Sequence, residues 1–158
     1  MTVDAVEEPF RTQLTVRLRD GHTLLGVGLP EPCTFTSGNG VDILWMGPDE
    51  YLVLADPGRQ IELETALRDE GAPAVVDVSA QRNVLRLTGS HARDVLAHGC
   101  SIDLDPSVSP PGTCVQTLFA RTGIVLLVRE DGFTILVRQS FAGYFTAWLA
   151  DASLEYVS

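Results

Sequence analysis

Two neighbouring carboxylates, Asp49 and Glu50, are the residues of this 158-residue sequence that most directly suggest chemistry. Paired carboxylates can serve as general acid and base when a substrate lies between them. Here they follow a glycine and Pro48, which favour a tight turn. Neighbouring side chains at a turn diverge into solvent, so the pattern favours a surface turn over a catalytic pair. Trp45 and Tyr51 flank this turn, either as packing residues or as an exposed aromatic anchor for a partner. The candidates for a partner interface here are Trp45, Pro48, Asp49, Glu50 and Tyr51.

Three further residues, His91, His98 and Cys100, are of types that bind metal ions. Zinc sites use ligands four residues apart on a helix, or closely spaced pairs. A spacing of seven residues separates the two histidines, which favours separate roles. We expect His98 to interact with the negative end of a helix and His91 to lie in its exposed first turn. The sequence therefore predicts no metal site.

Motifs for nucleophilic catalysis or nucleotide binding are incomplete. Ser90 lacks the glycines of a nucleophile elbow and is better suited to capping a helix. Dinucleotide-binding motifs need a third glycine after a pair such as Gly26 and Gly28, and this sequence lacks it. Pro30 follows instead, and it is incompatible with the helix that such a motif begins. All 11 basic residues are arginines, so no lysine is present for Schiff-base chemistry. We predict neither catalytic nor cofactor-binding residues in this chain.

One arginine has a position that favours recognition. Arg138 lies between the last predicted strand and the last predicted helix, where the helix dipole does not need a positive charge. Arginine binds carboxylates through two parallel hydrogen bonds, so Arg138 is expected to hold a carboxylate in this chain or in a partner. Together with Phe141 three residues later, it is a candidate for a partner interface.

The hydrophobic pattern predicts the elements that position these residues. Alternating or short apolar runs predict strands at residues 13–19, 41–46, 51–55, 74–78, 83–88, 113–119, 124–129 and 133–138. Helical spacing predicts helices at residues 58–70, 91–98 and 141–153, and the Gly- and Pro-rich residues 28–40 are expected to form a loop. Most strands are joined by tight turns, which require antiparallel pairing. The predicted fold class is α+β, with two layers, mainly antiparallel sheets and helices on one face.

The expected domain organisation is simple. Residues 1–12 are acidic and aperiodic and are predicted to form a flexible N-terminal arm. Residues 13–158 are predicted to form one domain with two α+β halves, about 13–79 and 80–158.

Charge and cysteine content restrict the partners and the compartment. The net charge of −10 disfavours nucleic acid and anionic membranes as partners. Residues 1–79 hold 14 acidic residues and five arginines, whereas residues 80–158 hold seven and six. The acidic half is either a solvated surface or a contact surface for a basic partner. Three cysteines at long spacings, no visible signal peptide and no long apolar segment predict a cytoplasmic protein.

Several motifs in a fixed order resemble the gamma subunit family of heterotetrameric sarcosine oxidase. They are LWMGPDEYL at 44–52, DVS at 77–79 with Arg82, LTG at 87–89, GCSIDL at 99–104 and RQSFA at 138–142 with Tyr144, Trp148 and Leu149. The resemblance covers about residues 40–152. It departs from the family pattern at Tyr51, where tryptophan is common, and at Gln139, which separates Arg138 from Ser140.

The resemblance implies a fold like part of the glycine-cleavage aminomethyltransferase. It implies a noncatalytic subunit within a complex that oxidatively demethylates sarcosine to glycine, with peroxide and a folate-bound one-carbon unit as further products. The implied partners are the beta, alpha and delta subunits, which would carry FAD, FMN, NAD, tetrahydrofolate and zinc. This chain itself is expected to bind no cofactor.

The segment 121–127 is where the catalytic relatives hold the pterin with acidic residues. Leu126 and Leu127 stand where those carboxylates are expected, and aliphatic side chains cannot accept hydrogen bonds from the pterin. We therefore expect the fold to be kept and the folate site to be lost. Two alternatives stay open: a stand-alone folate-dependent transferase relative using Asp77 or Asp103, and a homo-oligomeric binding module.

Overall fold

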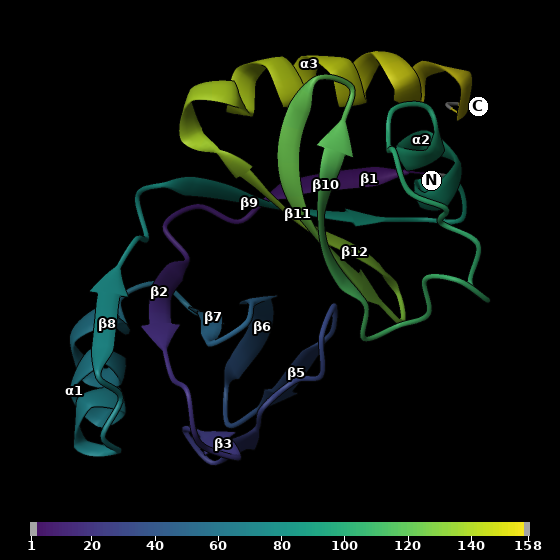
Figure 1. Ribbon diagram of the computed structural model, residues 1–158. Coiled ribbons are helices and arrows are strands. Elements are labelled where there is room, and N and C mark those ends of the chain that lie inside the picture. Colours follow the sequence, from purple (N-terminus) through teal and green to yellow (C-terminus); the bar gives the residue numbers. More distant parts are fainter. Residues whose placement is uncertain (1–2, 157–158) are drawn as a thin grey trace. The chain divides into compact units, whose positions relative to one another are not determined.

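A computed structural model describes residues 3–156 of the chain (Figure 1). The chain forms two compact units, each with its own five-stranded sheet. Unit 1 consists of Met1–Glu8 and Arg82–Ser158, and unit 2 consists of Pro9–Gln81. All strand pairs are antiparallel, as the tight turns require, which confirms the predicted α+β class. The predicted halves meet at residue 79, two residues before the observed boundary.

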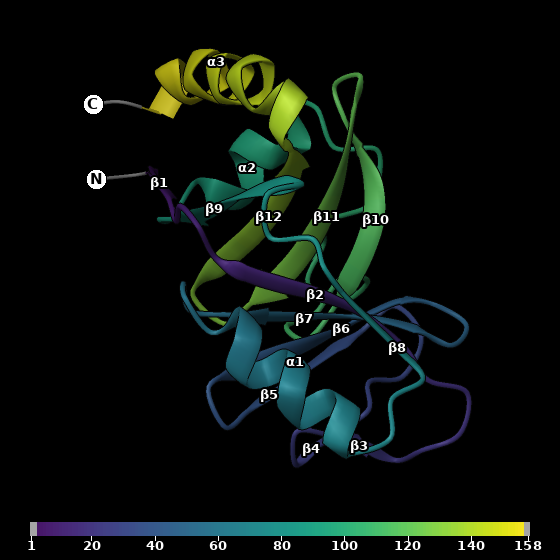
Figure 2. The ribbon, with the colours of Figure 1, turned by 90° about the vertical axis from the view of Figure 1, so that its left-hand side faces the viewer.

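Unit 2 is a sheet with one helix on it. Its elements are β2 (Thr12–Arg17), β3 (Thr23–Leu24), β4 (Val27–Gly28), β5 (Phe35–Gly38), β6 (Val41–Gly47), β7 (Glu50–Ala55), α1 (Gln60–Asp69) and β8 (Ala74–Asp77). The large sheet has the order β5-β6-β7-β2-β8, and α1 lies across it (Figure 2). Leu63 and Leu67 lie one helical turn apart and are buried in one cluster with Leu14 and Val16 of β2. The apolar side of the helix therefore completes the core of this unit.

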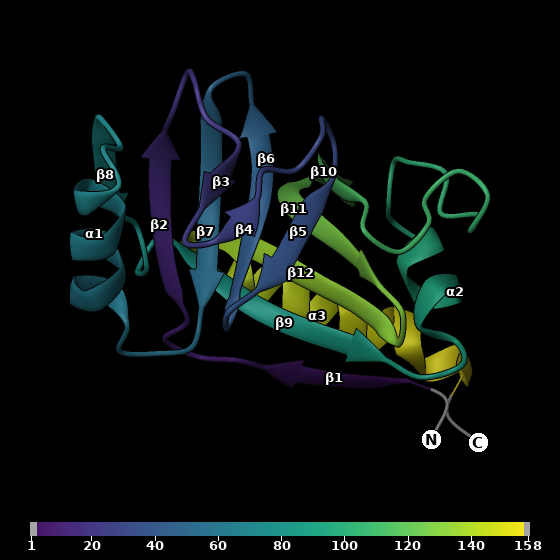
Figure 3. The ribbon, with the colours of Figure 1, turned by 90° about the horizontal axis from the view of Figure 1, so that it is seen from below.

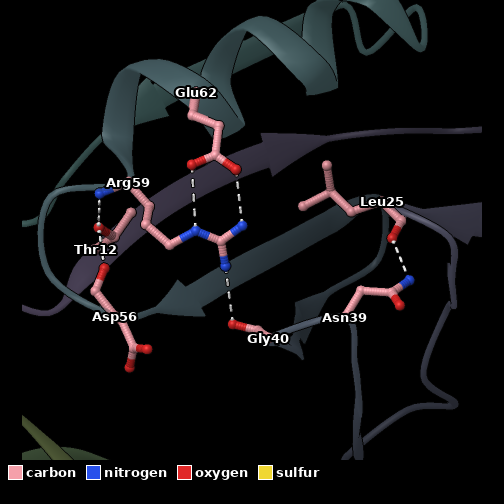
Figure 4. Close-up of polar contacts among 7 residues, drawn as sticks. All are labelled: Thr12, Leu25, Asn39, Gly40, Asp56, Arg59 and Glu62. Carbon is pink, nitrogen blue, oxygen red and sulfur yellow. Dashed lines mark hydrogen bonds and ion pairs between the residues drawn. The ribbon is translucent and has the colours of Figure 1, made fainter.

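Polar contacts hold the start of α1 in place (Figure 4). The backbone N–H of Arg59 donates to the Thr12 hydroxyl at 3.1 Å, and this hydroxyl donates to the Asp56 carbonyl at 2.7 Å. The Arg59 guanidinium binds Glu62 at 2.9 Å and the Gly40 carbonyl at 3.2 Å. The hydrogen bond from Arg59 lowers the pKa of Glu62. One side chain thus connects the helix to the β5–β6 turn.

The predicted loop at residues 28–40 contains strand β5, so that prediction is wrong for these residues. Asn39 and Gly40 both have positive φ, 51° and 78°, which a two-residue hairpin turn of type I′ requires. The Asn39 side chain donates to the Leu25 carbonyl at 3.1 Å (Figure 4). The Asn-Gly pair therefore closes a β5–β6 hairpin, although the polar residues of β5 give no strand-like pattern.

Unit 1 is a second sheet with two helices on one face. Its elements are β1 (Asp4–Glu7), β9 (Arg82–Thr88), α2 (Ala92–Ala97), β10 (Cys114–Phe119), β11 (Thr122–Arg129), β12 (Gly132–Arg138), the 3-10 turn η1 (Gln139–Phe141), α3 (Ala142–Ser153) and the 3-10 turn η2 (Leu154–Tyr156). The strand order is β1-β9-β12-β11-β10. Both α2 and α3 lie on the same side of this sheet (Figure 2). The core between them includes Phe119 and Phe145, whose rings meet edge to face at 5.0 Å.

Part of the predicted flexible arm forms strand β1, which lies beside β9 (Figure 3). The prediction of a flexible arm is therefore wrong for these residues. The pairing runs from Asp4 opposite Thr88 to Glu7 opposite Leu85. A further backbone bond joins the Glu8 N–H to the Val84 carbonyl at 2.8 Å. Backbone pairing to the edge of β9 needs no apolar alternation, so the sequence pattern gave no sign of this strand. Residues 1–2 of the predicted arm lie outside the described residues.

Candidate functional site

Five of the predicted interface residues gather at the β6–β7 hairpin of unit 2. They are Trp45, Pro48, Asp49, Glu50 and Tyr51. Trp45 lies opposite Tyr51, and a register irregularity between Trp45 and Gly47 precedes the turn. Pro48 and Asp49 form the two-residue loop, in which Asp49 has a φ of 61°. Proline followed by a residue with positive φ is the pattern of a type II turn.

The two carboxylates of this turn are engaged differently. Asp49 is exposed, and its carbonyl accepts the Leu18 N–H at 3.0 Å. The Glu50 carboxylate lies 3.5 Å from the Arg17 guanidinium, and these two residues are cross-strand neighbours on β7 and β2. An ion pair this exposed contributes little to stability. The interpretation of Asp49 and Glu50 as a surface turn, and not as an acid–base pair, fits this geometry.

The two aromatic residues beside the turn are half-buried. Tyr51 packs against the core of unit 2, as expected of a packing residue. The backbone N–H of Trp45 donates to the Thr34 carbonyl at 3.1 Å, which anchors β6 to the segment before β5.

The other two predicted interface residues, Arg138 and Phe141, belong to unit 1. Arg138 is the exposed last residue of β12, and Phe141 ends the turn η1 with 48% of its surface exposed. The predicted helix at 141–153 includes Phe141, but α3 begins one residue later, at Ala142. The 3-10 turn rotates Phe141 away from the helical face that buries Phe145 and Leu149.

The structure brings the two histidines of unit 1 together around a residue that the sequence analysis did not single out, Tyr156. The His91 ring stacks on the Tyr156 ring with centroids 4.9 Å apart, and His98 Nε2 lies 3.0 Å from the Tyr156 hydroxyl. His91 Nδ1 also lies 2.8 Å from Asp94. Within residues 3–156, no group of three or more His, Cys, Asp or Glu side chains is placed to hold a metal ion. Ser90 does not cap α2, because His91 takes the N-cap position without a side-chain hydrogen bond.

A pH titration should reveal the Tyr156 contact. Partial desolvation, with the negative charges of Glu155 and Asp94, raises the pKa of Tyr156 above its ordinary value of 10.0. A group whose folded pKa is raised stabilises the fold below its unfolded pKa, and this contribution is lost as the pH rises through the folded pKa. We expect one of the three tyrosines to ionise late in a tyrosinate absorbance titration. Tyr156→Phe should remove that late step, while Tyr144→Phe should leave it. A late step that persists in Tyr156→Phe would contradict the assignment.

The three cysteines, all free thiols, should differ in reactivity. Cys33 is exposed, Cys114 is buried, and burial raises the pKa of the half-buried Cys100 thiol. Because the thiolate is the reactive form, Cys100 should react with an aromatic disulfide reagent about tenfold or more slowly than Cys33 at mildly alkaline pH. Cys33→Ser should abolish the fast phase and Cys100→Ser should not. A fast phase that survives Cys33→Ser would show that a buried thiol is accessible.

The aspartates considered for one-carbon chemistry make local hydrogen bonds. The Asp77 carboxylate accepts from the backbone N–H and hydroxyl of Ser79 at 2.9 and 2.6 Å, and the Ser79 hydroxyl in turn accepts the Gln13 N–H at 2.9 Å. Asp103 accepts the Asp105 N–H at 2.9 Å. Both arrangements are typical of side chains that shape the turn in which they lie.

The leucines that stand in place of pterin-binding carboxylates lie within β11. Leu126 and Leu127 are both fully buried, and Leu126 belongs to the helix-covered core of unit 1. This segment is therefore used for packing.

Three residues that lie close to the predicted ones, Arg82, Gly123 and Tyr156, were not themselves predicted as site residues. Arg82 lies directly opposite Arg138 in the sheet, and Gly123 lies on the neighbouring strand at the same end. Arg82 occurs in one of the family-like motifs, which was the only signal available. Nothing local in the sequence marks Gly123 or Tyr156.

Helices on one face of antiparallel sheets define the fold class of this protein, which is that of the aminomethyltransferases. Glycine cleavage system aminomethyltransferase T from Bartonella henselae superposes with a TM-score of 0.64 at 14% identity, covering 94% of this chain and 45% of that one. At this identity the likeness concerns the fold alone. Within the part of the chain that the structure describes, no helix has the length and apolarity needed to cross a membrane.

The chain belongs to the sarcosine oxidase gamma subunit family, whose model matches residues 16–155. Sarcosine oxidase subunit gamma of Corynebacterium sp. (strain P-1) is 36% identical, covering 99% of this chain and 83% of that protein. The subunit of Arthrobacter sp. is 34% identical, with 96% and 80% covered. A chain of heterotetrameric sarcosine oxidase from Corynebacterium sp. U-96, in complex with pyrrole 2-carboxylate, matches with a TM-score of 0.86 and 34% identity over 99% of this chain and 86% of that one. The resemblance inferred from the motifs is confirmed.

Proposed function

We propose that this chain is a noncatalytic subunit of a heterotetrameric sarcosine oxidase, which oxidatively demethylates sarcosine to glycine. The observation that carries the proposal is the match over 99% of the chain, with a TM-score of 0.86, to a chain of such a heterotetramer. The partners would be the beta, alpha and delta subunits. FAD, FMN, NAD, tetrahydrofolate and zinc would be bound by those subunits.

The candidate residues support a role in contact and not in catalysis. Asp77 and Asp103 serve local turns, and Glu50 pairs with Arg17. The aliphatic residues Leu126 and Leu127 cannot replace carboxylates in holding a pterin. The three free thiols agree with a cytoplasmic location.

The proposed contact surfaces are the β6–β7 turn of unit 2 and the exposed Arg138 and Phe141 of unit 1. Aromatic and arginine side chains are typical anchors of protein interfaces. The turn carries the exposed Asp49 and follows the half-buried Trp45, so it offers both charge and apolar area to a partner.

Co-expression with the other subunits tests the proposal. The tagged chain should co-purify with flavoproteins, whereas the chain expressed alone should be colourless and inactive on sarcosine. Calorimetry should detect no tetrahydrofolate binding to the isolated chain. A yellow, sarcosine-oxidising preparation of this chain alone would overturn the proposal, and folate-dependent heat stabilisation would favour the transferase alternative.

A further inference from the structure

A hollow of about 660 Å³ lies on the surface of unit 2, where three segments of the chain meet. Phe10 precedes β2, Gln60 begins α1, and residues 77–81 end β8 and follow it. The third segment is anchored to β2, because the Val78 N–H donates to the Gln13 carbonyl at 2.9 Å. The DVS motif at 77–79 therefore lines a surface hollow and is not part of the core.

Phe10 brings an exposed aromatic ring to this hollow. Its side chain is 84% exposed, and its φ of 60° is a backbone conformation that bulky residues rarely adopt. Ile61, the neighbour of Gln60 in α1, is 83% exposed. Exposed apolar residues that gather beside a hollow are typical of protein interaction sites, and aromatic rings are frequent anchors there.

The hollow also contains a carboxylate that no positive charge of the chain neutralises. Oδ1 of Asp77 accepts the N–H and the hydroxyl of Ser79 at 2.9 and 2.6 Å. Among residues 3–156, Asp77 forms no ion pair and its Oδ2 accepts no hydrogen bond. Unit 2 holds 11 acidic residues and five arginines, a net charge of −6. The surroundings of Asp77 therefore favour a cation.

An arginine side chain fits these features better than a metal ion does. Its guanidinium donates charge-assisted hydrogen bonds to a carboxylate and also stacks on aromatic rings. Its apolar stem can lie on apolar surface, which Val78 and Ala80 supply here. A metal ion needs several ligands, and within residues 3–156 no group of three acidic, His or Cys side chains is placed to hold one.

We propose that the hollow beside Phe10 binds an arginine side chain of another subunit, with the guanidinium on Asp77 Oδ2 and against the Phe10 ring. This inference rests on the proposed function for the identity of the partner. It assigns the acidic unit 2 to contact with a basic partner surface, since opposite charges attract the two surfaces before they meet.

The guanidinium chemistry can be tested without any partner. The full-length chain, labelled with ¹⁵N, is titrated with N-acetylarginine amide or with its citrulline analogue, which has a similar shape and no charge, at constant ionic strength. The backbone N–H resonances of Val78 and Ser79 should shift and saturate with the arginine compound only. Asp77→Asn should abolish the response, although it keeps an oxygen that can accept both Ser79 hydrogen bonds. No shift, or equal shifts with the two compounds, would overturn the proposal.

Asp105 of unit 1 supplies a matched control. Its carboxylate accepts the N–H and the hydroxyl of Ser107 at 2.9 and 2.6 Å, the same arrangement as that of Asp77 and Ser79. Asp105→Asn therefore removes one charge from the same kind of turn outside the hollow, and it should leave the titration unchanged. A response lost in Asp105→Asn as well would mean that total charge attracts the arginine compound, which would also overturn the proposal.

A second experiment tests the partner. In co-expression with the other subunits, Asp77→Asn and Phe10→Ala should each weaken assembly about tenfold or more, because each removes one of the two groups that hold the arginine. Asp105→Asn should change assembly less than about twofold, as expected of an exposed charge outside the interface. If the unaltered chain assembles and Asp77→Asn assembles equally well, this inference alone is overturned. If the unaltered chain fails to assemble, the proposed function fails, and the assignment of the partner fails with it.

Discussion

Replacing Phe145 with alanine should lower the free energy of unfolding of unit 1 by about 3–5 kcal/mol, the usual cost of removing a buried aromatic ring. Phe145 has 0% exposed surface and meets the Phe119 ring edge to face at 5.0 Å. The lost ring leaves a cavity between α3 and the sheet, which the surrounding strands cannot close. Urea denaturation followed by Trp148 fluorescence measures the loss, since Trp148 also packs edge to face on Phe119 at 5.1 Å.

The matched control is Phe141→Ala, four residues earlier, at a side chain that is 48% exposed. It should change stability by less than about 0.5 kcal/mol, as most surface substitutions do. A Trp45→Phe background leaves Trp148 as the only tryptophan and confines the signal to unit 1. Equal losses for the two phenylalanines would mean that Phe145 is not the centre of this core.

Gly132→Ala should destabilise unit 1 by about 3 kcal/mol or more, because it combines backbone strain with a steric clash. Gly132 begins β12 with a φ of 152°, a conformation that other residues rarely adopt. An added Cβ would lie 2.2 Å from the Leu87 carbonyl oxygen on the paired strand β9. Since the Cβ is fixed to the backbone of β12 and the carbonyl oxygen belongs to the backbone of β9, the clash can be relieved only by moving a strand.

Gly123→Ala, on the adjacent strand β11, is the control for this substitution. Its Cβ meets no atom within 4 Å, so it should change stability by less than about 1 kcal/mol. The same urea denaturation in the Trp45→Phe background compares the two variants. A Gly132→Ala protein as stable as Gly123→Ala would contradict the β12–β9 register.

Each of the two units carries one of the proposed contact surfaces. Unit 2 presents the β6–β7 turn with its aromatic pair and carboxylates, and unit 1 presents the exposed Arg138 and Phe141. Both are positioned by regular antiparallel sheets. Contact residues held on strands and tight turns are set before a partner binds, which reduces the entropy lost on association.

The sequence by itself determined most strands and all three α-helices, because each buries one side and its apolar residues repeat with the period of the element. It also determined the β6–β7 turn, since Pro48 restricts the backbone locally. The family was inferred from several motifs in a fixed order. This inference rests on likeness to other sequences and not on the physical chemistry of a local segment.

Only the tertiary structure decided which distant residues meet. The β1–β9 pairing rests on backbone hydrogen bonds, which leave no side-chain pattern in the sequence. The contact of His91 and His98 with Tyr156 depends on where α2 ends relative to η2. The juxtaposition of Arg82 and Arg138 depends on the β9–β12 register, to which both strands and their intervening segments contribute. Local propensity reports how a segment is buried, whereas strand register is settled by the packing of the whole unit.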